Sequence, residues 1–74
     1  MGKRLTKGAL QAAMNRIERE PNNDAALQAG ADLLGVGFER DIDGGLLYRG
    51  AFYPDRDELV DEILCDLGNK RNGL

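Results

Sequence analysis

The sequence has no histidine, no serine and no tryptophan, and it has one threonine and one cysteine among its 74 residues. Histidine is the usual general base, serine and cysteine are the usual nucleophiles, and histidine and cysteine bind most transition metals. Their scarcity leaves few ways to build a catalytic or metal centre. We therefore expect a protein that is not an enzyme and that uses no metal and no cofactor.

The single cysteine also bears on the compartment. Cys65 has no second cysteine with which to form an internal disulfide, and this fits a reducing cytoplasm. Its acidic neighbours Asp61 and Glu62 disfavour a reactive thiolate. No stretch approaches the ~18 apolar residues of a membrane span, and no signal-peptide core is present. The sequence predicts a cytoplasmic protein that does not enter a membrane.

What is present is typical of one small folded domain. Hydrophobic residues make up 42% of the chain and charged residues 31%, which is too apolar for a disordered segment. The net charge of −3 is unevenly distributed, because residues 1–20 are basic on balance and residues 21–74 are strongly acidic. We expect a single domain over residues 1–74, with flexible tails at 1–5 and 69–74.

Two amphipathic helices are predicted in the first half. Apolar residues recur at spacings of three and four from Leu10 to Ile17, and they predict a helix over residues 7–19 with Thr6 as its N-cap. The segment from Pro21 to Asn23 is typical of a turn, and a second helix over 24–34 is expected to end at Gly35. The short turn favours an antiparallel pair.

The hydrophobic period then changes from 3.6 to 2, and this predicts a β-hairpin over residues 36–52. A three-residue loop, 43–45, places Ile42 opposite Leu46 and Glu39 opposite Arg49. This register gathers the apolar residues on one face, whereas a two-residue loop mixes the two faces. The predicted buried face consists of Val36, Phe38, Ile42, Leu46, Tyr48 and Phe52. Leu47 is left on the polar face.

A third helix is predicted from a cap at Asp55 to a stop at Gly68, with a buried stripe that includes Leu59, Ile63 and Leu67. The expected fold is a small α+β domain of order α-α-β-β-α, in which an antiparallel β-hairpin packs against three helices.

Acidic pairs such as Asp41 with Asp43, or Asp57 with Asp61, raise the question of a metal or glycosidase site. Asp43 is explained by turn geometry, the spacing of an EF-hand loop is absent, and a chain of this size leaves little room for a cleft between two catalytic acids. We interpret these residues as solvated acids.

The main functional hypothesis is a protein-binding module, an accessory or inhibitory protein whose partner presents a basic surface. Six acids lie within the twelve residues 55–66, more than helix capping requires, and complementary charge would direct such an encounter. Small proteins of this kind are common on phages and other mobile elements, which is a general property of small proteins rather than a deduction from these residues. The predicted protein-binding residues are Asp57, Glu58, Asp61, Glu62, Asp66, Leu47 and Arg49.

Two alternatives remain open. The first is non-specific contact with a nucleic-acid backbone through the basic residues of the first helix and its flank, Lys3, Arg4, Lys7, Arg16 and Arg19. The second helix has no Arg, Lys or Ser with which to read bases, so sequence-specific recognition is not expected. The second alternative is a structural homodimer, formed through apolar residues outside the predicted core, namely Leu33, Leu47, Tyr53 and Cys65.

Overall fold

The computed structural model describes residues 5–40 and 42–74, and these form a small α+β domain. Along the chain the elements are α1 (Lys7–Arg19), α2 (Asp24–Leu33), β1 (Phe38–Arg40), β2 (Leu46–Tyr48), β3 (Ala51–Tyr53) and α3 (Arg56–Asn72). The predicted fold class is confirmed. The difference is a third strand, which turns the expected hairpin into an antiparallel sheet of order β1-β2-β3.

Local signals fix the ends of the first two helices. The Thr6 hydroxyl accepts the amide of Ala9 at the start of α1, and the Asn23 side chain accepts the amide of Ala25 at the start of α2. After α2, Gly35 has a φ of 77°, and the amide of Val36 donates to the carbonyl of Ala31. This is the Schellman arrangement, in which a glycine in the left-handed region closes the helix.

The last helix is longer than predicted. Gly68 does not end α3, which continues to Asn72, so most of the segment predicted as a C-terminal tail is helical. Contacts with α1 explain the extension: the Met14 methyl lies 3.6 Å from where a Cβ of Gly68 would be, and Arg71 donates to Gln11. In the predicted N-terminal tail, Leu5 packs partly buried against the core, and residues 1–4 lie outside the described part of the chain.

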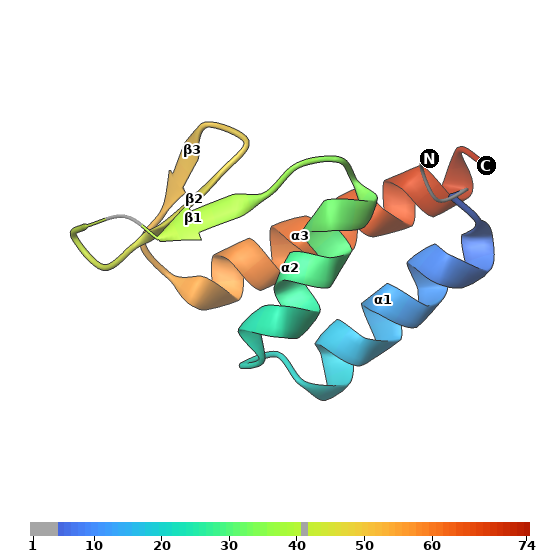
Figure 1. Cartoon of the computed structure of the whole chain (residues 1–74), viewed down its shortest axis with the longest axis horizontal. Helices are drawn as coiled ribbons and strands as arrows, with labels where there is room; N and C mark the ends of the chain where they lie inside the picture. Colours follow the sequence, from blue (N-terminus) through green and yellow to red (C-terminus); the bar gives the residue numbers. More distant parts are fainter. Residues whose placement is uncertain (1–4, 41) are drawn as a thin grey trace.

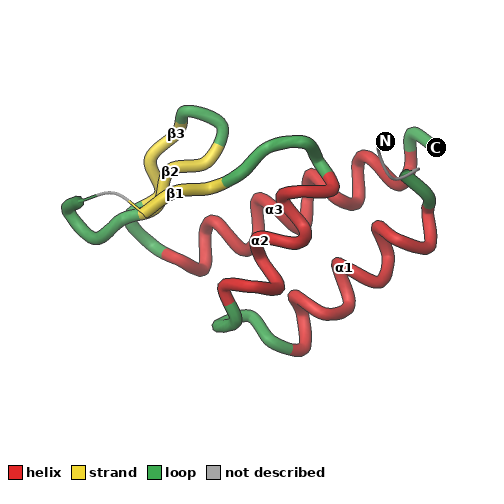
Figure 2. Tube along the Cα trace, in the orientation of Figure 1, coloured by secondary structure: helices red, strands yellow, loops and turns green. Residues whose placement is uncertain are grey.

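Helices and sheet occupy different parts of the molecule. In Figure 1, α1 runs against the direction of both α2 and α3, and the sheet lies beside the first half of α3. Figure 2 shows the strands at the end of the molecule opposite the beginning of α1 and the end of α3. The expected antiparallel pair of α1 and α2 is therefore present, and the sheet rests mainly on α3 through β2 and β3.

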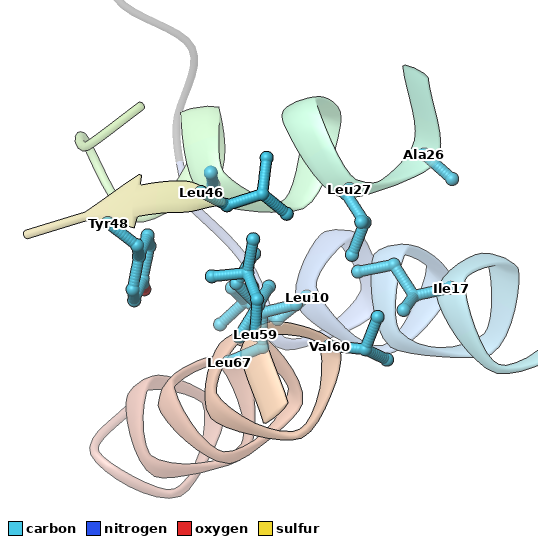
Figure 3. Packing of buried hydrophobic residues seen from close by; sticks show 11 residues of the cluster. Leu10, Ile17, Ala26, Leu27, Leu46, Tyr48, Leu59, Val60 and Leu67 are labelled. Atoms are coloured by element: carbon cyan, nitrogen blue, oxygen red, sulfur yellow. The ribbon is translucent and has the colours of Figure 1, made fainter. Parts of the chain in front are cut away.

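The core is built where all three helices meet β2. In Figure 3, the side chains of Leu10 and Leu27 converge with Leu59 of α3, while Leu46 and Tyr48 point inward from β2. Gly30 of α2 allows close packing, because a Cβ there would lie 2.8 Å from the Ile17 Cδ1 atom. The fully or nearly fully buried apolar residues are Leu10, Ile17, Ala26, Leu27, Ala31, Leu46, Tyr48, Leu59, Val60, Ile63 and Leu67.

The predicted hairpin register is wrong by two residues. Arg40 pairs with Leu46 and Phe38 with Tyr48, so five residues rather than three separate the paired ends of β1 and β2. Ile42 therefore lies in the loop, where it is 98% exposed, instead of opposite Leu46. A shift of two residues keeps each side chain on its face, and for this reason Phe38, Leu46 and Tyr48 still face the helices.

The segment predicted as one second strand is two strands. Arg49 and Gly50 have φ angles of 53° and 79° and form a two-residue turn with both central φ angles positive, the pattern of a type I′ turn. The turn brings Phe52 opposite Leu47, on the sheet face away from α3, where the Phe52 side chain is half-exposed. The expectation that Phe52 is buried with Tyr48 is therefore wrong, and Tyr53 takes the inward position, packed edge-on against the Tyr48 ring.

Candidate functional site

An acidic row follows the exposed side of the first half of α3. We define this row as Asp57, Glu58, Asp61 and Glu62; all four residues are exposed, as predicted, and none forms an ion pair within residues 5–40 and 42–74. The structure therefore brings together four of the seven predicted protein-binding residues as one charged surface. Two of the acids lie in the first turn, where they also favour the positive end of the helix.

Asp66, the fifth predicted acid, does not belong to the acidic row. Its side chain is only 15% exposed, and its Oδ2 atom accepts hydrogen bonds from the Tyr48 hydroxyl at 2.7 Å and from Arg49 Nη1 at 3.2 Å. Burial first, and this hydrogen bond next, raise the pKa of Tyr48 above its ordinary value. Asp66 therefore joins α3 to the sheet, a role that its position in the sequence did not reveal.

Arg49 and Leu47 are not part of the acidic row either. Arg49 occupies the β2–β3 turn and its guanidinium reaches back to α3, so the predicted pairing with Glu39 is wrong. Leu47 lies between Glu39 and Phe52 on the outer sheet face, which points away from α3. Leu47 is therefore on the sheet face that α3 does not cover, whereas Arg49 reaches α3 at Asp66.

Tyr53 was predicted to lie outside the core, but in the structure it packs against the core from β3. It is partly buried on the inner face of β3, and burial followed by the charge of Glu62 raises its pKa. The signal that could have placed Tyr53 was Gly50, since a glycine that follows Arg49 between two apolar segments permits a turn and reverses which residues face inward.

A second ion-pair cluster joins three elements near the start of α2. The Asp24 carboxylate accepts from both Arg40 of β1 and Arg56 of α3, and Arg56 also donates to the Pro21 carbonyl. The hydrogen bond from Arg56 is the largest cause that lowers the pKa of Asp24. All three charged side chains are paired with one another, so this cluster joins elements of the fold and is not an open site.

The basic residues of the nucleic-acid alternative are not gathered on one surface. Lys7 and Arg16 are about two and a half helical turns apart, which places them on opposite sides of α1. Arg16 also lies 3.9 Å from Glu20 in an exposed ion pair, and Arg19 is on the last turn of the helix. Lys3 and Arg4 lie outside the described residues.

The four apolar residues of the homodimer alternative do not form a patch. Leu33 and Tyr53 pack partly buried against the core, whereas Leu47 lies on the outer sheet face. Cys65 is exposed on α3, and the side-chain Nδ2 atom of Asn69 lies 3.8 Å from its Sγ atom. These residues therefore supply no common apolar surface for a second copy.

Two features are absent from residues 5–40 and 42–74, a group of metal ligands and a membrane-spanning helix. No group of three or more Cys, Asp or Glu side chains is arranged to hold a metal ion there, and Asp41, one of the acids considered above, lies outside these residues. No helix in the same residues is both long and apolar enough to cross a membrane.

Comparisons with family models, with curated protein sequences and with solved structures gave no significant match.

Proposed function

We propose that this protein is a non-enzymatic binding module whose acidic row docks onto a basic surface of another protein. The observation that carries the proposal is the contrast in pairing between the acids of α3. Asp66 is enclosed and bonded to Tyr48 and Arg49, while the four residues of the acidic row are exposed and have no cationic partner in the described part of the chain.

The spacing within the row supports a role beyond solubility. Asp57 and Asp61 are four residues apart, as are Glu58 and Glu62, so each pair places two like charges on neighbouring turns of α3. Such pairs destabilise a helix, and a basic residue at the second position would stabilise it instead. A basic partner would relieve this repulsion on binding.

The test is a charge reversal in the row, Asp61→Lys with Glu62→Lys, compared with a matched reversal elsewhere, Glu18→Lys with Asp43→Lys. Both double variants change the net charge by the same amount, and all four positions are exposed. Each tagged protein is used to capture partners from native lysate, with and without nuclease treatment, at low and moderate salt. We expect the row variant to lose a basic protein that the wild type and the control variant both retain.

Thermal unfolding separates lost binding from lost folding. The row variant should melt at the same temperature as the wild type or slightly higher, because the new lysines lie four residues after Asp57 and Glu58. Capture of the same protein by both double variants would contradict the proposal, and so would a captured band that disappears after nuclease treatment. The second result would favour nucleic-acid contact.

A further inference from the structure

A groove of about 460 Å³ lies between the segment that joins α2 to β1, the β2–β3 turn and the second half of α3. Leu34 and Val36 give it an apolar wall, and Arg49, Asn69 and Lys70 give it a polar lining. This volume falls within the range of sites that hold small molecules, about 300–1,000 Å³, and a mixed apolar and polar lining is usual for them.

The guanidinium of Arg49 is held at this groove by an unusual local structure. Arg49 has a φ of 53°, at a turn position where asparagine or glycine is normally found, since a side chain destabilises the left-handed region. Its Nη1 atom donates to Asp66, whose carboxylate is shielded and is also fixed by Tyr48. Arg49 is thereby oriented, while its Nε and Nη2 donors bond to no residue in the described ranges.

A second cation lines the same groove. Lys70 follows Asp66 by one helical turn, and it forms no ion pair with residues 5–40 or 42–74. The charged groups of the lining are thus two cations and one carboxylate, in a protein whose net charge is −3. An arginine oriented by a shielded carboxylate, with a lysine nearby, is an arrangement that suits planar or tetrahedral oxyanions.

We propose that this groove binds an anionic group, a carboxylate or a phosphate, held by Arg49 and Lys70, with the apolar part of the ligand against Leu34 and Val36. The groove does not use the acidic row, so this proposal is independent of the proposed protein partner. Asp66 is a positioning residue here, because it orients Arg49 through their shared hydrogen bond.

The experiment is an NMR titration of the ¹⁵N-labelled protein with inorganic phosphate and, separately, with acetate, at an ionic strength kept constant with sodium chloride. We expect saturable shifts of the amide signals of Arg49, Gly50, Asn69 and Lys70 with at least one of the two probes. Saturation with phosphate alone assigns a phosphate group, saturation with acetate alone assigns a carboxylate, and saturation with both assigns a general oxyanion site.

Three variants make the titration specific. Arg49→Asn keeps a residue that tolerates the turn, Lys70→Gln removes the second charge, and Arg19→Gln removes an exposed charge on α1 as the matched control. Each groove variant should bind the probe about tenfold more weakly, the effect of one lost charge-assisted hydrogen bond, and the control should bind as the wild type does. Absence of saturable shifts with both probes, or unchanged binding by the two groove variants, would overturn the proposal.

Discussion

The helical part and the sheet part of this molecule are stabilised in different ways. The three helices bury leucine and isoleucine side chains completely, and each helix begins at a side-chain cap. The sheet has three strands of three residues each, one face against α3 and an outer face that carries Leu47 and Phe52. A sheet this short depends on its turn and on its anchor to α3, because three residues per strand make few hydrogen bonds.

Carboxylates at the junctions between elements differ from those on the exposed side of α3. Where elements meet, carboxylates are paired, as Asp24 is with Arg40 and Arg56 and as Asp66 is with Arg49. On the exposed side of α3, carboxylates are unpaired within the described residues, although compensating cations would be easy to place there. We infer that charge at the junctions serves the fold and that charge on α3 is directed outward.

The largest expected loss of stability comes from a substitution in the helical part. Leu27→Ala removes a fully buried side chain at the meeting point of the helices and should lower the free energy of unfolding by about 3 kcal/mol, a large share of the total for a small domain. Phe52→Ala on the outer sheet face is the matched comparison and should change it by less than about 1 kcal/mol, because the ring is already half-exposed. Urea denaturation followed by circular dichroism measures both, and equal losses would show that the outer sheet face contributes as much to stability as the buried core.

The second effect tests the anchor between the sheet and α3. Tyr48→Phe removes the hydroxyl that donates to Asp66 and should lower the free energy of unfolding by about 1.5 kcal/mol. Folding raises the pKa of Tyr48 from its ordinary value of 10, so the folded state holds the phenolic proton more tightly than the unfolded state. This contribution is complete below pH 10 and is lost as the pH rises above it.

The pH dependence of stability reports the ionisation of the Tyr48 hydroxyl. Between pH 8 and pH 11, the free energy of unfolding should fall more for the wild type than for Tyr48→Phe, because the phenyl ring of the variant does not titrate. Urea denaturation at the two pH values measures both changes. Tyr53→Phe is the control at pH 8, where neither phenol is ionised, since Tyr53 makes no hydrogen bond to another residue within 5–40 and 42–74. Equal losses in the wild type and in Tyr48→Phe would contradict the role assigned to the hydroxyl.

The smallest effect concerns the β2–β3 turn. Gly50→Ala places a methyl group on a residue with a φ of 79° and should lower the free energy of unfolding by about 1 kcal/mol, without a steric clash, because no atom lies within 4 Å of the new Cβ. Thermal unfolding measures the change, and Gly8→Ala near the start of α1 serves as the control, since a glycine in a helix gains from a methyl group. A neutral Gly50→Ala would show that the turn does not determine the sheet.

Helices could be predicted better than strands, and the reason lies in particular residues. The bounds of α1 are confirmed at Lys7 and Arg19, and Gly35 ends α2 as expected, because a helix forms its hydrogen bonds within four residues and its caps are adjacent in sequence. The prediction of the sheet was wrong at two places, the loop around Ile42 and the turn at Arg49. Both are decided by which residues pair across strands, and a one-sided alternation of apolar residues is compatible with more than one pairing.

The sequence by itself determined the three amphipathic helices, the α+β class and the surplus of acids on α3. Hydrophobic periodicity and helix caps involve residues that are close in sequence, so these signals do not depend on tertiary contacts. The tertiary structure decided which charges are paired, since Asp24 meets Arg56 and Asp66 meets Tyr48 only after distant elements pack together. It also decided that Phe52 is left on the outer face, because the turn that precedes it, and not its hydrophobicity, sets the side of the sheet on which it lies.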